Sequence, residues 1–241
     1  MASVIAKPAQ QKDNLCGPFC AARILDVDQD VVAMRAGTRL SAASAAPSVP
    51  RGAESRTDYR YELPEAPDAE SGTSAAGLMG AIDSLSGGSL KCVPVRGEWT
   101  AARVESLLED APALGARLIA NIRTGKLWGS HPTAHQILAE LGGSEVDGPP
   151  ADWDDGHFVE LEMLVRGPKA SLVAVHDTYP ALGLDGHHLQ PPRVVAQALM
   201  RGDGREGGIL AVAPADKADE VAGLVRGLGL QVGTWDNGSR S

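Results

Sequence analysis

The chain has few cysteines, few aromatic residues and no long apolar run. Its 241 residues include 3 Cys, and Phe, Trp and Tyr together make up 4%. No apolar run approaches the roughly 18 residues that a membrane span needs. The first residues, MASVIAKPAQQ, lack the apolar stretch of a signal peptide. We therefore expect a cytoplasmic protein without a membrane span.

The chain also has fewer basic than acidic residues. The chain has 22 Lys and Arg against 31 Asp and Glu, which gives a formal net charge of −9. This balance argues against nucleic acid or an anionic membrane as the main partner, and the few aromatic residues leave little material for stacking on bases. Three cysteines are an odd number, which fits a reducing compartment and leaves at least one thiol without a partner within the chain.

Hydrophobic periodicity predicts an α+β fold in a single domain over residues 1–241, with helices first and a mainly antiparallel sheet after them. Asp13 or Asn14 is expected to cap the first helix. Two segments, at about 41–74 and 126–156, lack periodicity and are interpreted as irregular inserts near a site. Helices are expected at about 14–25, 31–36, 75–85, 100–111, 134–141, 191–200 and 215–230, and strands at about 89–95, 116–124, 157–165, 170–178 and 207–214.

Cys16 occupies the start of the first predicted helix, in the segment QQKDNLCGPFCAARIL. A helix N-terminus favours the thiolate form of a cysteine, which is the nucleophile. Gly17 would let the backbone approach a substrate closely. Six residues before the cysteine is Gln10, with Gln11 beside it, and a side-chain amide there can join the Cys16 backbone N–H in stabilising an oxyanion.

This segment resembles the active-site segment of papain-like cysteine peptidases, most closely the bacteriocin-processing branch that cleaves after a double glycine. Members of that branch have a Gln six positions before a Cys-Gly pair that opens a helix. They also have a His at the start of a strand and an Asp or Asn about twenty residues later. Here GHFVELEML contains His157, which follows Cys16 by 141 residues (157 − 16), and VAVHDTYPALG contains Asp177, which follows His157 by 20 (177 − 157).

The resemblance implies a papain-like fold, with an N-terminal helical part packed on the C-terminal sheet, and no cofactor. Cys16 would be the nucleophile, His157 the general base and later the general acid, Asp177 the residue that orients the imidazole, and Gln10 the oxyanion donor. The implied activity is hydrolysis of a peptide, such as the leader or linker of a ribosomally made, modified peptide.

Two alternatives remain open from the sequence. The same scaffold can be used to modify a peptide, for example by closing a thioether ring of the lanthionine type, in which case His157 would activate the thiol of the substrate. The protein can also be a leader-peptide binding module without catalysis, although the nucleophile and the base are both present. Cys20 and Cys92 are interpreted as packing residues.

No metal site is expected. His131 and His135 are four residues apart, but Pro132 and the surrounding loop favour a helix N-terminus at this point, and no glutamate stands between them as in a zinc peptidase. His187 and His188 are adjacent and should point apart on an extended chain. The tryptophans in irregular segments, Trp128, Trp153 and Trp235, are candidates for the lining of a cleft.

Overall fold

The structure is a computed structural model that describes residues 9–42 and 49–240. Residues 1–8, which hold most of the stretch used to predict the absence of export, lie outside the described residues, as do residues 43–48 in the first predicted insert. None of the helices in the described part of the chain combines the length and the apolar character that a membrane span requires.

The framework of the described residues is a seven-stranded sheet in which every neighbouring pair is antiparallel. Its order is β7-β6-β5-β4-β8-β3-β9. The central strand β4 has apolar residues at successive positions, such as Leu118 and Ile119, because both of its faces are buried. The strands are β3 (Leu90–Arg96), β4 (Arg117–Arg123), β5 (Gly156–Arg166), β6 (Ser171–His176), β7 (His187–Gln190), β8 (Gly208–Pro214) and β9 (Gln231–Val232).

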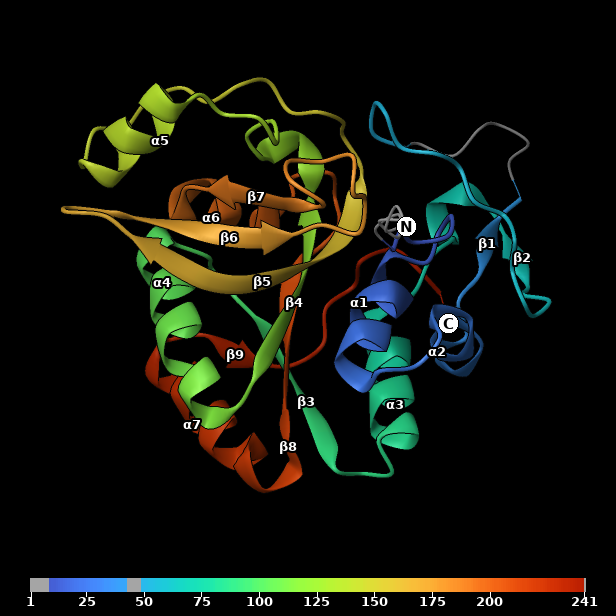
Figure 1. Cartoon of the computed structure of the whole chain (residues 1–241). Coiled ribbons are helices and arrows are strands. Elements are labelled where there is room, and N and C mark those ends of the chain that lie inside the picture. The colour runs from blue at the N-terminus through green and yellow to red at the C-terminus, as the bar shows by residue number, and fades with distance from the viewer. Residues whose placement is uncertain (1–8, 43–48, 241) are drawn as a thin grey trace, which may run out of the picture.

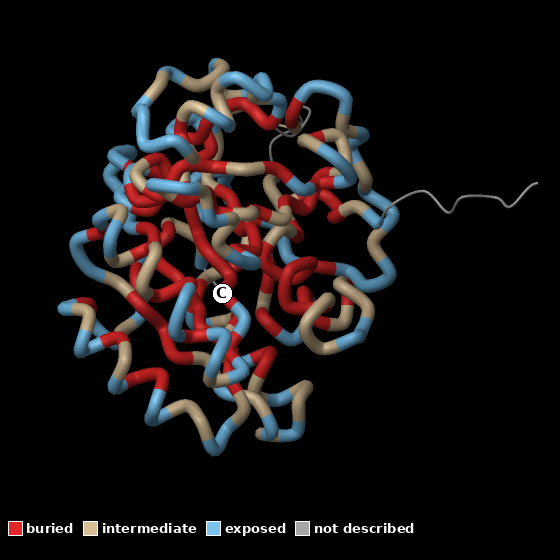
Figure 2. Tube along the Cα trace, turned by 60° about the vertical axis from the view of Figure 1, so that its left-hand side comes forward, coloured by how far each residue is buried: buried red, intermediate tan, exposed pale blue. Residues whose placement is uncertain are grey.

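Helices cover both faces of this sheet, and each face has its own apolar core (Figure 1). On one face pack α1 (Cys16–Leu25), α2 (Gln29–Ala36) and α3 (Ala75–Leu85). On the other face pack α4 (Ala101–Asp110), α6 (Pro192–Met200) and α7 (Ala218–Gly227). Buried stretches of the trace gather in the interior of the molecule, and exposed stretches lie mainly at its periphery (Figure 2).

The predicted α+β class is confirmed, and the N-terminal helices pack on the sheet as expected. The second helical layer was not predicted, because the sequence shows that α4, α6 and α7 are amphipathic but not which face of the sheet they cover. The strand β7 was also missed, since its four residues are too few for an alternating pattern to stand out.

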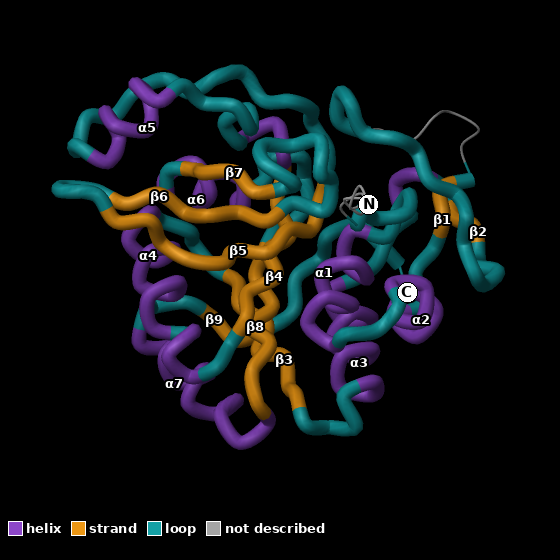
Figure 3. Tube along the Cα trace, in the orientation of Figure 1, coloured by secondary structure: helices purple, strands orange, loops and turns teal. Residues whose placement is uncertain are grey.

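The described parts of both predicted inserts are largely irregular but contain short regular elements (Figure 3). The described part of the 41–74 segment contains β2 (Glu65–Ala66), which pairs in parallel with β1 (Leu40–Ser41). The 126–156 segment contains α5 (Ala134–Leu141), as the sequence predicted, with a capping box at Thr133.

Candidate active site

Cys16 is the first residue of α1, and no side chain caps this helix. The expected caps are wrong, because the N-cap residue is Leu15, whose side chain is buried and cannot accept a hydrogen bond. The backbone N–H of Cys16 has no backbone acceptor among the described residues. The helix therefore presents an unsatisfied N–H and the positive end of its dipole beside a half-buried thiol.

Close packing of α1 on β5 determines where the thiol lies. A Cβ atom added at Gly17 would stand 3.2 Å from the Phe158 ring and 3.3 Å from Leu78, so this glycine allows the close approach of helix and sheet. One turn later, the Cys20 thiol donates to the backbone carbonyl of Phe158 at 3.7 Å. Gly17 thus lets α1 pack closely on Phe158, the residue after His157, and this brings Cys16 near His157.

The sheet register brings His157 to Asp177. In the antiparallel pair of β5 and β6, Glu160 stands opposite His176, so the start of β5 extends past the end of β6. His157 is the second residue of β5, and Asp177 directly follows β6. The imidazole Nε2 lies 3.1 Å from Asp177 Oδ1 and 3.2 Å from the Thr178 hydroxyl. Because both of these contacts involve Nε2, Nδ1 is the ring nitrogen that is left to interact with the Cys16 thiol.

The charges of these three side chains depend on one another. Burial lowers the pKa of the His157 imidazole, but Asp177 and Cys16 oppose it by charge and by hydrogen bonds, and the net pKa is raised to about 10. Burial raises the pKa of Asp177, but the charges and hydrogen bonds of His157 and His188 prevail and hold it well below its usual value. At neutral pH the site therefore holds an imidazolium beside a buried carboxylate.

A second histidine orients Asp177 from its other side. His188 Nε2 lies 3.9 Å from Asp177 Oδ2, and His188 Nδ1 is 3.0 Å from the Gln190 amide nitrogen. The Gln190 side chain is fixed by Trp128, whose backbone N–H donates to Oε1 at 2.8 Å and whose carbonyl accepts from Nε2 at 2.9 Å. Because Gln190 donates to Nδ1, Nε2 is the His188 nitrogen that carries a proton, and it faces Asp177.

Two aromatic side chains enclose the imidazole. The Tyr179 ring stacks on His157 with centroids 5.8 Å apart and an interplanar angle of 19°. Trp153 meets the same ring edge-on at 5.0 Å and 72°. They shield the His157–Asp177 pair from water, which strengthens its electrostatic interaction. Of the tryptophans proposed for a cleft, Trp153 lines the pocket, whereas Trp128 and Trp235 belong to the cores.

Gln11, not Gln10, lies in this site. The Gln10 amide donates to the backbone carbonyl of Glu54 at 2.6 Å, outside the pocket, so the structure does not bring this predicted residue to Cys16. Gln11 is buried and lines the pocket. Its Nε2 donates to the Tyr179 hydroxyl at 2.9 Å and its Oε1 accepts from Thr178 at 2.5 Å. The Gln11 backbone N–H donates to the Thr178 carbonyl at 3.2 Å, and this bond holds Gln11 beside the site with its side chain directed inward.

Cys16, His157, Gln11 and the aromatic pair line one pocket of about 910 Å³. This volume lies at the upper end of the roughly 300–1,000 Å³ that is common for ligand sites. Both predicted inserts contribute to its walls. The first insert is held against the segment that precedes α1, because the side chains of Arg56 and Tyr59 donate to the backbone carbonyls of Gln10 and Asp13. The second insert contributes Trp153 and Asp155 to the lining of the pocket.

The other two thiols are packing residues, as predicted. Cys20 belongs to the core under α1, and burial, followed by the charge of Glu160, raises its pKa well above the usual value. Burial raises the pKa of Cys92 on β3 to about 12. Neither thiol is suited to act as a nucleophile at neutral pH.

The histidine pair weighed for a metal does not form a site in the described residues. Because α5 begins at Ala134, His131 precedes the helix and contacts the Ser130 hydroxyl at 3.0 Å, while His135 lies within the helix. Adjacent residues of β7 point apart as expected, with His188 buried and His187 exposed. His187 instead meets Glu162 and His176, a group of possible metal ligands that the sequence reasoning missed.

A family model matches almost the whole chain, at residues 2–236, and its description is a family of unknown function, DUF6885. No curated protein and no solved structure matches the chain. Because the match covers far more than half of the sequence, the chain belongs to the DUF6885 family.

Proposed function

We propose that this protein is a cysteine hydrolase of papain-like architecture that acts on a peptide. The observation that carries the proposal is the position of Cys16, at the uncapped N-terminus of α1 and in contact with an imidazole that Asp177 keeps protonated. A protonated His157 and a helix N-terminus both stabilise a thiolate. This arrangement has a nucleophile, a base and an orienting residue in the order that nucleophilic catalysis needs.

In the proposed reaction, the Cys16 thiolate attacks the carbonyl carbon of a substrate amide. The oxyanion of the tetrahedral intermediate accepts hydrogen bonds from the Cys16 backbone N–H and from the second N–H of the Gln11 amide. His157 then gives its proton to the leaving amine, and a thioester forms. A water molecule attacks the thioester while His157 takes its proton, and release of the carboxylic acid restores the thiolate and the imidazolium.

A peptide is the proposed substrate because the pocket has a volume of about 910 Å³ and is lined in part by two largely irregular segments. Residues within 40–41 and 57–73 line the pocket, and so do Trp153 and Asp155, which shortly precede β5. Backbone groups in such segments can pair with an extended peptide. The side chains that reach the pocket, among them Tyr59 and Trp153, would select substrate side chains.

The test is turnover of candidate peptides by the full chain, followed by mass spectrometry. Hydrolysis adds one water and yields two fragments, whereas ring closure leaves the mass of the peptide unchanged. Cys16→Ala should abolish cleavage, and Cys92→Ala, the matched control on β3, should cleave at the rate of the parent. Cleavage by Cys16→Ala would refute the proposal, and ring closure in place of cleavage would replace it with the cyclase reaction.

A separate measurement tests the nucleophile without any substrate. Iodoacetamide should alkylate Cys16 near neutral pH well before Cys20 and Cys92, whose pKa values are raised by burial. Equal reactivity of Cys16 and Cys92 would contradict the proposed role of the His157 imidazolium.

A further inference from the structure

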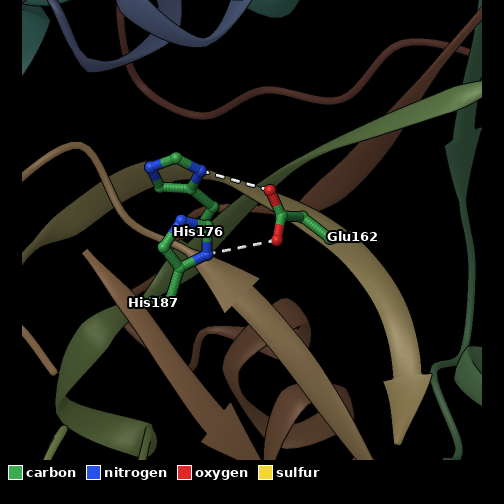
Figure 4. Close-up of side chains that lie close together, drawn as sticks. All are labelled: Glu162, His176 and His187. Atoms are coloured by element: carbon green, nitrogen blue, oxygen red, sulfur yellow. Dashed lines mark hydrogen bonds and ion pairs between the residues drawn. The ribbon is translucent and has the colours of Figure 1, made fainter. Parts of the chain in front are cut away.

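Three side chains with ligating atoms meet outside the candidate active site, on neighbouring strands at one end of the sheet (Figure 4). Glu162 comes from β5, His176 from β6 and His187 from β7. His176 Nδ1 is 3.1 Å from Glu162 Oε1, and His187 Nδ1 is 3.2 Å from Glu162 Oε2. The ligating atoms of all three side chains lie within 4.8 Å of one another. Both imidazoles are directed at a single carboxylate, as Figure 4 shows.

An irregularity of the sheet helps to build this group. The register between β5 and β6 shifts between Leu161 and Met163, so Glu162 is an extra residue without a partner on β6. Such a bulge interrupts the hydrogen-bond ladder and re-aims a side chain, and bulges are common next to functional sites. His176 and His187 stand directly opposite each other in the β6–β7 pair, so they share a face of the sheet. The bulge lets one glutamate reach both of them.

The distances suit a shared metal ion. In a tetrahedral zinc site with bonds of about 2.05 Å, neighbouring ligand atoms are about 3.3 Å apart. The two nitrogen-to-oxygen distances, 3.1 and 3.2 Å, are close to that spacing. The imidazole rings also lie with centroids only 3.9 Å apart, a contact that two protonated rings would oppose. Two neutral imidazoles and a carboxylate form a common ligand set for Zn²⁺ and a poor one for Mg²⁺ or Ca²⁺.

We propose that Glu162, His176 and His187 bind a zinc ion, through Nδ1 of each histidine and one or both carboxylate oxygens, with water at the remaining position. Each neutral ring then carries its proton on Nε2. Arg23 is a cation beside this group, with Nη2 at 3.9 Å from Glu162, but its Nη1 forms a closer ion pair with Glu160 at 2.8 Å. The positive charge of Arg23 is thus largely balanced before a metal binds.

The site would hold together the hairpin that carries Asp177. His176 directly precedes Asp177, and His187 directly precedes His188. A metal that bridges these two histidines closes the loop of residues 177–186 at its base, on the face opposite the contact between Asp177 and His188. In this proposal zinc therefore has a structural role, which is to cross-link β6 and β7 at the base of this loop. The inference does not depend on the proposed hydrolase activity.

The test is titration of the full-length chain with Zn²⁺ in competition with a chromophoric chelator. A Cys16→Ala background prevents the candidate nucleophile from binding zinc itself. One zinc ion per chain is expected. His187→Ala should weaken zinc binding by more than about tenfold, because even outer partners of metal ligands carry losses of that size. His135→Ala removes another exposed histidine, on α5, and should bind zinc as the background does.

A second variant keeps the proposal falsifiable if a histidine substitution disturbs the hairpin. Glu162→Gln retains the size of an exposed side chain and removes its charge, so it should fold and still lose zinc affinity. Zinc should also raise the melting temperature of the background chain but not that of Glu162→Gln. Absence of zinc binding in the background, or binding unchanged by both His187→Ala and Glu162→Gln, would overturn the proposal. Neither outcome would bear on Cys16 catalysis.

Discussion

Asp177→Asn is the most informative single change at the candidate active site. The Asp177 carboxylate is the strongest of the influences that raise the pKa of His157 against the effect of burial. The pKa of this imidazole lies at about 10, compared with the usual value of 6.5. A difference of this size corresponds to about 5 kcal/mol in favour of the protonated ring, at about 1.4 kcal/mol per pKa unit.

Replacing the carboxylate by an amide of the same shape removes that charge and leaves the ring buried. Burial then dominates, so the pKa of His157 should fall to its usual value or below it. The imidazolium would be lost near neutral pH, and Cys16 would lose the positive charge that stabilises a thiolate. An unassisted thiol with a pKa near 8.5 is only about 1% thiolate at pH 6.5. Alkylation at about this pH should therefore slow by roughly 10- to 100-fold.

The assay is the rate of Cys16 carboxamidomethylation by iodoacetamide at several pH values, read by mass spectrometry of the peptide that contains Cys16. Titration of the His157 ring by NMR gives its pKa directly in the same two proteins. Asp68→Asn is the matched control, because Asp68 also lines the pocket but bonds to Ser41 and not to His157. The reasoning is refuted if Asp177→Asn alkylates as fast as the parent at pH 6.5, or if Asp68→Asn slows the reaction equally.

Three further predictions concern the remaining parts of the site. Gln11→Ala should lower kcat/KM for a cleaved peptide by about 10²- to 10³-fold, the usual loss for one oxyanion donor, whereas a comparable loss in Gln10→Ala would restore the residue chosen from the sequence. Gly17→Ala should lower the free energy of unfolding by about 1–3 kcal/mol through overpacking against β5, measured by urea denaturation. Gly80→Ala, in α3 with no atom within 4 Å of the added Cβ, should be neutral or stabilising, and equal losses in the two variants would contradict the packing argument. Because the pKa of His157 is higher in the folded state, at about 10, its stabilising contribution is fully present below about pH 6.5 and is lost as the pH rises to about 10. The melting temperature of the parent should accordingly fall more between these pH values than that of His157→Gln, and parallel curves would exclude a raised pKa.

Local sequence determined most of the regular elements. Periodicity and capping residues act within one or two turns of chain, so the helix that Thr100 caps and the helix that ends at Gly37 could be predicted closely. The order and spacing of Cys16, His157 and Asp177 also selected residues that the structure brings into one site. The reason is that short connections between successive strands allow few topologies for an antiparallel sheet, so the order of the elements restricts where these residues can lie.

Contacts between distant segments decided the rest. The choice between Gln10 and Gln11 is a difference of one position, and it depends on the bond between the Gln11 backbone and Thr178, far along the chain. The helices α4, α6 and α7 pack on the face of the sheet that α1, α2 and α3 leave exposed, and this choice of face cannot be derived from their own sequences.

The group of Glu162, His176 and His187 shows the limit of the sequence most clearly. No short spacing connects these residues, and they meet only because β5 to β7 are neighbours and a bulge adds one residue to β5. The sequence by itself therefore determined most of the regular elements and the reactive residue types. The tertiary structure alone decided which side chains face one another, because sheet register and packing are set by residues that are far apart in the chain.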